Sequence, residues 1–396
     1  VGDVAAEDGG VINIIGGSVE AQGLLASSNA SIILNGGGKI IGSKVERHDD
    51  EDPNVAFADI AADISDGSTL KATNVDFTGG IEASGRSKII LNGGSVTAGQ
   101  FYDKANKPLY STEIGADGAT IELNKVKIDS NLGAFDGGVI TVSDSNVNAD
   151  TAIFASGKGA VINLNSSDGK ATYTVGEDGV EAADGGVINI NGGTLHTTNI
   201  SVEGNGSKFI TDGSVEAQKI VAGSNASVSL NGGGKITGYK YDDGNTLAAS
   251  VTGNSTLTAT NVDFTGDFKA EEGSKIILKG GSVTASDYYE NGKKDGYTEF
   301  GAIGENSIIE AEGVDIKSAT LATDGAKVTI KNSNINTVEG IWAWGKGTIN
   351  LISTDGKATY TASGEGVEAF DGGVININGG GTLHTTNISV EDNGSK

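Results

Sequence analysis

The chain has 396 residues, of which 63 are glycine, two are proline and none is cysteine, and its formal net charge is −25. The lack of cysteine excludes a disulfide framework or a thiolate metal site, and the negative charge disfavours nucleic acid and anionic membranes, which attract clustered Lys and Arg. Glycine does not occupy every third position, and Val, Ile and Leu recur periodically, so the composition is that of neither collagen nor a disordered linker.

The segment 8–17 reads Asp-Gly-Gly-Val-Ile-Asn-Ile-Ile-Gly-Gly, and it recurs with one change, as Asp-Gly-Gly-Val-Ile-Asn-Ile-Asn-Gly-Gly, at 184–193 and 371–380. A short alternating run between glycine pairs predicts a β-strand between two tight turns. Its recurrence indicates a stacked repeat architecture.

A longer repeat relates the two halves of the chain. Residues 68–79 closely match residues 255–266, and residues 168–174 are identical to residues 355–361 at the same offset. We therefore expect one continuous domain over 1–396 that is internally duplicated, with copies at about 8–208 and 209–396.

Each half also contains a shorter repeat unit. A large apolar residue begins the unit, and a second apolar residue often lies two positions later. A spacing of two places both side chains on one face of a strand. The opening residues are Ile12, Ile32, Leu70, Ile89, Ile121, Ile140, Ile162, Ile188, Phe209, Val228, Leu257, Ile276, Ile308, Val328, Ile349 and Ile375.

Units of roughly 20 residues cannot bury a face alone, but they can when stacked. The sequence therefore predicts an all-β fold, a right-handed parallel β-helix of about 16 or more turns with side loops; a left-handed hexapeptide solenoid would need a strict six-residue period, which is absent. Asparagines that follow the strands are expected to stack along the axis and share amide hydrogen bonds. They are Asn35, Asn92, Asn191, Asn231 and Asn378.

The two copies differ in their insertions, and binding residues are more often found in loops than in the repeated strands. Residues 42–60 correspond to 238–248, residues 99–114 correspond to 286–302, and two tryptophans appear in the second copy only. Tyrosine and tryptophan dominate binding hot spots, although such rings can also simply cover the side of the solenoid. The candidate partner-binding residues are Tyr102, Tyr110, Tyr239, Tyr241, Tyr288, Tyr289, Tyr297, Trp342 and Trp344.

Catalytic chemistry has little support in the sequence. The histidines are His48, His196 and His384, and the last two occupy one repeated position. Without cysteine a thiol nucleophile is excluded. A polysaccharide-cleaving site needs clustered carboxylates with Arg or His nearby, and the only arginines are Arg47 and Arg86. We therefore expect no enzyme activity, no catalytic residues and no cofactor.

The acidic run 48–52 is the one segment that resembles a calcium site in composition. It lacks the alternating Asp-x-Asp-x-Asp-Gly spacing of calcium loops, so a solvated acidic loop is the simpler interpretation and no metal site is expected. The sequence also has no run of 18 apolar residues and does not begin with methionine, so we expect neither a membrane span nor a signal peptide within it.

The imperfect repeats of about 20 residues, the Asn-Gly-Gly corners, the lack of cysteine and the side loops resemble autotransporter passenger domains, the type V secreted proteins of bacteria, over essentially the whole chain. That resemblance implies export through the outer membrane to the cell surface or the medium. The chain is also similar to the pro-angiogenic passengers of Bartonella, which implies action on vascular endothelial growth factor (VEGF) receptors.

The resulting functional prediction is a non-catalytic virulence factor, secreted or displayed on the bacterial surface, that binds a host cell-surface protein as an adhesin or a receptor ligand. On the closer resemblance it is an agonist of VEGF receptors that promotes angiogenesis. Two alternatives stay open, namely a passenger that self-associates in aggregation or biofilms and a polysaccharide-active β-helix enzyme. No nucleic acid partner and no direct membrane insertion are expected.

Overall fold

The computed structural model describes residues 2–46, 55–242, 244–290 and 293–396, with no side-chain description for residues 55, 288–290 and 293–297. These residues form strands, turns and loops, and no helix occurs among them. The chain divides into two compact units, which we call unit 1 (Val1–Thr197) and unit 2 (Thr198–Lys396). The prediction of a single continuous domain over 1–396 stays a prediction.

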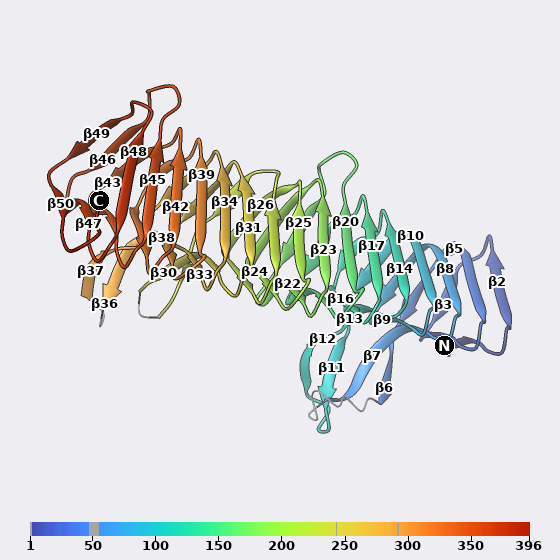
Figure 1. Ribbon diagram of the computed structural model, residues 1–396. Helices are drawn as coiled ribbons and strands as arrows, with labels where there is room; N and C mark the ends of the chain where they lie inside the picture. The colour runs from blue at the N-terminus through green and yellow to red at the C-terminus, as the bar shows by residue number, and fades with distance from the viewer. Residues whose placement is uncertain (1, 47–54, 243, 291–292) are drawn as a thin grey trace. The chain divides into compact units, whose positions relative to one another are not determined.

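Within unit 1 the chain passes in turn through three series of parallel strands, and one full passage is called a coil (Figure 1). The first series contains β2 (Val11–Ile15), β5 (Ser31–Ile41), β8 (Thr69–Thr78), β10 (Lys88–Thr97), β14 (Thr120–Asn124), β17 (Val139–Ser143), β20 (Val161–Asn165) and β23 (Val187–Asn191). The second series contains β3 (Val19–Ala21), the ends of β5, β8 and β10, β15 (Lys127–Asp129), β18 (Val147–Ala149), β21 (Thr172–Val175) and the start of β24 (Thr194–Glu203). The third series contains β1 (Val4–Ala6), β4 (Leu24–Ala26), β7 (Val55–Ile64), β9 (Gly80–Ser84), β13 (Glu113–Asp117), β16 (Asn131–Phe135), β19 (Ala152–Ser156) and β22 (Gly179–Ala183).

Unit 2 repeats this arrangement. Its first series contains β25 (Lys208–Thr211), β27 (Ser227–Leu230), β31 (Thr256–Thr260), β34 (Lys275–Lys279), β39 (Ile308–Glu312), β42 (Lys327–Lys331), β45 (Thr348–Ile352) and β48 (Val374–Asn378). Its second series contains the start of β26 (Ser214–Gly223), β28 (Gly234–Ile236), β32 (Val262–Thr265), β35 (Ser282–Thr284), β40 (Asp315–Lys317), β43 (Asn334–Thr337), β46 (Thr359–Ala362) and β49 (Thr382–Thr385). Its third series contains the end of β26, β30 (Thr246–Val251), β33 (Asp267–Glu271), β38 (Glu299–Ile303), β41 (Ala319–Thr323), β44 (Gly340–Ala343), β47 (Gly366–Ala369) and β50 (Ile388–Val390).

Three parallel series wound in sequence define a parallel β-helix in each unit, which confirms the predicted fold class. Antiparallel strands leave the coils at the insertions. In unit 1 they are β6 (Ser43–Glu46), β11 (Gln100–Asp103) and β12 (Pro108–Ser111), and in unit 2 they are β29 (Tyr239–Lys240), β36 (Asp287–Glu290) and β37 (Lys293–Tyr297).

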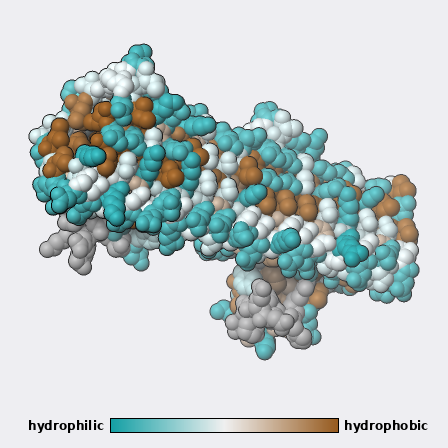
Figure 2. All heavy atoms as spheres, viewed as in Figure 1, coloured by the Kyte–Doolittle hydropathy of each residue, from teal (hydrophilic) through white to brown (hydrophobic). Residues whose placement is uncertain are grey.

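The core lies inside the coils, because alternate residues of each strand point inward. In β17 the side chains of Ile140 and Val142 are fully buried, whereas Thr141 between them is half-buried. The outward side chains are mostly polar, and the visible surface is largely hydrophilic or neutral (Figure 2). The predicted inward position of Ile308 is wrong by one residue: Ile309 pairs with Ile276 and Val328 and is fully buried.

Each position of the Asp-Gly-Gly motif needs its residue type for a different conformational reason. At 184–186, Asp184 and Gly185 have φ angles of 51° and 91°, in the left-handed region. A Cβ on Gly186 would lie 2.0 Å from the carbonyl oxygen of Ala155 in the preceding coil. The first two residues therefore form the corner of the coil, and the third allows two backbones to approach closely.

The predicted asparagine stacking is confirmed at two of the five positions. The Asn191 amide donates to Asn165 Oδ1 at 2.7 Å, and Asn124 donates to Asn92 Oδ1 at 3.1 Å. Asn35 instead accepts a hydrogen bond from Thr73, and Asn231 donates to Ser229, two residues earlier in the chain. Stacking therefore depends on the residue that the next coil places in register.

We predict that Gly138→Ala destabilises the chain by about 2 kcal/mol or more, because the new Cβ would lie 2.0 Å from the Ala116 carbonyl oxygen and the backbones would have to separate. Gly17→Ala is the matched control, because its Cβ would meet its nearest atom at 3.9 Å. Urea unfolding followed by circular dichroism measures both. Equal midpoints for the two variants would contradict this account of the motif.

Candidate functional site

The most distinct departure from the coils is a four-stranded antiparallel sheet in unit 1, which we call the side sheet. It consists of β6, the first half of β7, β11 and β12, and it projects from the coils of its unit (Figure 1). The point where β11 and β12 leave the coil, which we call the neck, is held by two reciprocal hydrogen bonds. Gly99 N donates to Thr112 Oγ1 at 2.7 Å, and Thr112 N donates to the Gly99 carbonyl at 3.1 Å. Thr112 and Ile114 are buried in the coil, so the insertion spans 100–111 and not 99–114.

One face of the side sheet carries an apolar row. Val45, Ala58 and Phe101 are in register, and the Phe101 ring lies 5.0 Å from that of Tyr110. Ala58 is fully buried, whereas Val45 and Tyr110 are 37% and 42% exposed. The row is therefore closed to solvent at Ala58 and open to solvent at its two ends.

The opposite face carries Tyr102 in a polar network. Its hydroxyl donates to Asp59 Oδ2 at 2.8 Å, and Lys44 Nζ lies 3.4 Å from the centre of its ring. The hydrogen bond to Asp59, with burial and the Asp59 charge, raises the pKa of the Tyr102 phenol. These contacts fix the ring on the sheet.

In unit 2, Tyr239 and Tyr241 form an edge-to-face pair 5.1 Å apart and are 37% and 40% exposed. Lys219 Nζ lies 4.6 Å from the Tyr239 ring. Tyr288, Tyr289 and Tyr297 belong to the hairpin β36–β37, whose backbone pairing is described, but their side chains lie outside the described residues.

The structure separates the two tryptophans, and the prediction for Trp342 needs correction. Trp342 is only 7% exposed, because its ring folds over Gly340 and lies against Ala319 and Leu321. Trp344 is 37% exposed and stacks on Phe370 at 4.9 Å. Of the two tryptophans, Trp344 alone therefore presents ring area to solvent. Phe300, in the same insertion as the tyrosines by sequence, is also buried in the core.

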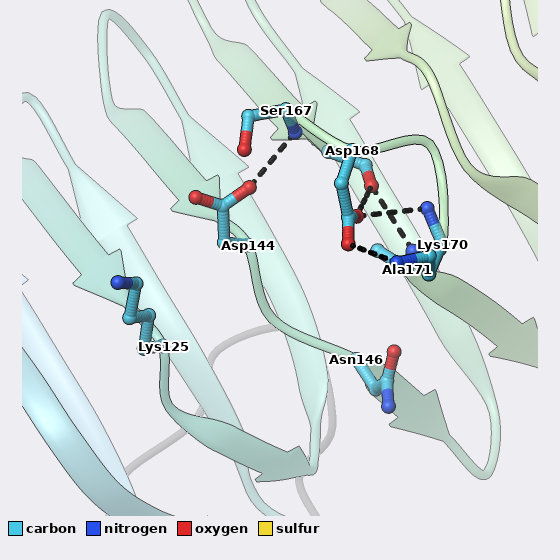
Figure 3. Close-up of a pocket in the computed structure, with 8 residues that line it drawn as sticks. Lys125, Asp144, Asn146, Ser167, Asp168, Lys170 and Ala171 are labelled. Atoms are coloured by element: carbon cyan, nitrogen blue, oxygen red, sulfur yellow. Dashed lines mark hydrogen bonds and ion pairs between the residues drawn. The ribbon is translucent and has the colours of Figure 1, made fainter.

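The sequence also missed a cavity of about 440 Å³ at the corner between the first and second series of unit 1 (Figure 3). Asp144 and Asp168 line it, with Lys125 and Lys170. Ser167 N donates to Asp144 Oδ1 at 2.8 Å, and this bond lowers the pKa of Asp144; the Lys170 N–H likewise lowers that of Asp168. Burial, followed by the charge of Asp144, raises the pKa of the core residue Tyr173 to about 12.

The same corner occurs in unit 2 without the Asp144 carboxylate. Asn332 takes its place, and its Oδ1 accepts a hydrogen bond from Thr354 N at 2.8 Å. Asp355 Oδ1 accepts from Lys357 N, as Asp168 does from Lys170 N. Since an amide makes the same bond as the carboxylate, stabilisation of the turn accounts for this polar cluster.

A second missed feature is on the outside of the third series, where residues in register form what we call the outer column. In unit 1 the outer column is Asp63, Glu82, Gly115, Gly133, Phe154 and Glu181. In unit 2 it is Ser250, Lys269, Gly301, Leu321, Trp342 and Glu368. Alternation predicts outward positions here, but the cross-coil register that aligns them is visible only in the structure.

Beside the outer column of unit 1 lies a carboxyl group with a shifted pKa, that of Glu113. Glu113 is half-buried and reaches over Gly133, where an added Cβ would lie 2.6 Å from Glu113 Oε2. Burial, followed by the negative charge of Glu82, raises the pKa of Glu113 from 4.5 to about 7. The glycines of the column make room for this side chain.

The remaining predicted residues add no catalytic cluster. His196 and His384 lie in equivalent second-series strands, opposite Thr174 and Thr361. His48 and the acidic run 48–52 lie outside the described residues. No group of three or more His, Asp or Glu side chains suited to a metal occurs in the parts of the chain described above. Within the same parts, no helix has the length and hydropathy of a membrane span.

Comparisons with protein-family models, with curated proteins and with solved structures gave no match in any of the three.

We predict that Glu113 makes stability depend on pH. Because its pKa is higher in the folded chain than its ordinary value of 4.5, the folded chain binds more protons between pH 4.5 and 7, and the free energy of unfolding falls as pH rises through this range. The full effect is up to about 3 kcal/mol. Urea midpoints at pH 5 and pH 8 measure it.

Glu113→Gln should remove this part of the pH dependence and stabilise the chain at pH 8. Glu20→Gln, at an exposed position of β3, is the control and should keep the wild-type slope. A Glu113→Gln variant with the wild-type slope would show that the burial does not control titration.

Proposed function

We propose that this chain is a non-catalytic binding protein, an autotransporter passenger that is secreted or displayed on the bacterial surface, and that the side sheet of unit 1 binds a protein on the host cell. The observation that carries the proposal is the exposed apolar row of the side sheet. In a chain with a net charge of −25, this row lies outside the coils, on a sheet of its own, with Val45 37% and Tyr110 42% exposed.

The chemistry of the row suits protein recognition. Tyrosine supplies a large, rigid contact area at a low entropic cost, and it is enriched at hot spots. Tyr110 and Val45 provide the exposed contact area, Phe101 packs against Tyr110, and Ala58 is fully buried. The network of Tyr102, Asp59 and Lys44 stiffens the opposite face, and a preorganised surface loses less entropy on binding.

Unit 2 supplies a related surface through Tyr239 and Tyr241. Two binding surfaces on one chain can raise avidity, or bring two receptors together, when linker geometry matches the sites. Receptor pairing of this kind is the physical route by which the chain would act as an agonist of a growth-factor receptor such as a VEGF receptor. Adhesion alone requires only one surface.

The double variant Val45→Thr, Tyr110→Ser should lower binding to endothelial or epithelial cells by roughly tenfold or more, because truncation of a central aromatic typically costs about 2 kcal/mol. The control is Ile210→Ser, which removes a side chain of similar exposure, 38%, from a strand of unit 2. Flow cytometry with the labelled chain measures binding, and circular dichroism confirms folding.

A deletion of residues 100–111 removes β11 and β12 from the side sheet and leaves the coil closed, because Gly99 and Thr112 already face each other at the neck. We expect loss of cell binding with an unchanged circular dichroism spectrum. Full binding by both variants would refute the assignment to the side sheet. Binding that needs no host protein, seen as concentration-dependent dimers lost in the double variant, would favour self-association instead. Phosphorylation of a VEGF receptor distinguishes an agonist from an adhesin.

A further inference from the structure

Two Asn-Gly pairs in this chain lie in identical local sequences, one pair in each unit. Residues 187–193 and 374–380 both read Val-Ile-Asn-Ile-Asn-Gly-Gly, so Asn191 and Asn378 have the same intrinsic reactivity. Both side chains are exposed at the end of a first-series strand. The carbonyl oxygen of each residue accepts a hydrogen bond at 2.9 Å from a serine N–H of the preceding coil. Sequence and backbone pairing therefore do not distinguish the two asparagines.

The neighbours of the two side chains do differ. The Asn191 amide donates to Asn165 Oδ1 of the preceding coil at 2.7 Å. In unit 2 the position of Asn165 is taken by Ile352, which pairs in register with Asn378 and has no polar side-chain atom. Within the described residues the Asn378 side chain makes no hydrogen bond. One asparagine is thus held across the coils and the other is not.

Three further asparagines precede a glycine at the end of a first-series strand segment, and all three have side-chain hydrogen bonds. They are Asn35, Asn92 and Asn231. In the part of the chain that the structure describes, Asn378 is therefore the one member of this set whose side chain no hydrogen bond holds. The N–H of Gly379, the residue after it, donates no hydrogen bond to a described residue either.

An unrestrained asparagine before glycine can react with its own backbone. Glycine has no Cβ to obstruct the approach of its nitrogen to the asparagine Cγ. The glycine nitrogen forms a bond to Cγ and gives up its proton, the bond from Cγ to the side-chain nitrogen breaks, and ammonia leaves. The product is a succinimide ring. Water then opens one of the two ring carbonyls and gives aspartate or isoaspartate.

We propose that Asn378 is a site of spontaneous modification in the folded chain, through a succinimide formed with Gly379, whereas Asn191 is protected. The hydrogen bond to Asn165 must break before the Asn191 Cγ can approach the next residue, and Asn378 has no such restraint. The reaction adds one carboxylate to a chain whose net charge is −25. It does not involve the side sheet, so the proposal goes beyond the proposed function and can fail without affecting it.

The isoaspartate product also changes the corner of the coil. Its chain runs through the side-chain carbons, which adds one backbone atom immediately before Gly379. The corner has little room for that atom, because a Cβ on Gly379 would lie 2.1 Å from the Ser353 carbonyl oxygen. Isoaspartate at 378 therefore pushes this corner of β48 away from the preceding coil.

Incubation of the full folded chain at pH 8, followed by peptide mapping, tests the proposal. Trypsin releases the two sites in the peptides 171–208 and 358–396, and fragmentation in the mass spectrometer assigns each deamidation to its residue. We expect Asn378 to deamidate roughly fivefold faster than Asn191, the factor that one hydrogen bond is typically worth. In urea the two rates should become equal, because the local sequences are identical. Equal rates in the folded chain would overturn the proposal.

Reciprocal exchange of the neighbouring residue isolates the cause. Ile352→Asn supplies the missing partner and should slow deamidation of Asn378 to the rate of Asn191, whereas Asn165→Ile should raise the rate of Asn191 to that of Asn378. Each variant places in one unit the residue that the other unit already has, so both should fold, and circular dichroism confirms it. Ile352→Val is the matched control and should leave the rate at Asn378 unchanged. Equal slowing by Ile352→Val and Ile352→Asn would show that the hydrogen bond does not control the reaction.

Discussion

Parallel hydrogen bonding between successive coils is the constraint on which the rest of the structure depends. Every strand must lie in register with the strand one coil earlier, so the backbone corners of neighbouring coils come into direct contact. At those corners an ordinary side chain has no room, as the 2.0 Å distance from the Gly186 Cβ position to the Ala155 carbonyl shows. The glycine content of the chain thus follows from the stacking. The burial of apolar side chains inside the coils stabilises the stacked strands.

The sequence was sufficient to predict the fold because the information is local and repeated. An apolar residue at every second position specifies the inward face, and Asp-Gly-Gly specifies the corner. Prediction failed where the deciding contact was with another coil. Ile308 and Ile309 are both apolar, and only pairing with Ile276 and Val328 selects Ile309. Trp342 has an outward position, but Gly340 leaves space into which its ring folds, against Leu321. Tyr102, Tyr110, Tyr239 and Tyr241 do lie in insertions, which the sequence reveals because they interrupt the period; their role in binding stays a prediction.

Because the two units have related sequences, each position of one unit can be compared with the corresponding position of the other. The corner at Asp144 and Asn332 keeps the same hydrogen bond despite a change of charge, which identifies a structural role. The outer columns differ instead in charge, side-chain volume and aromatic content, through Glu82 against Lys269 and Gly133 against Leu321. Positions that diverge while their scaffold is retained are therefore those whose side chains the fold does not dictate.

The reciprocal hydrogen bonds at the necks allow the insertions to change in sequence without disturbing the coils. Gly99 with Thr112, and Ser286 with Thr298, close the coil beneath each insertion, so the coil is complete whatever sequence lies between the paired residues. Recombination at these points exchanges one surface segment for another without shifting the register of any strand. Each unit therefore has a defined exchange point, and a new loop can be grafted there at little cost to stability.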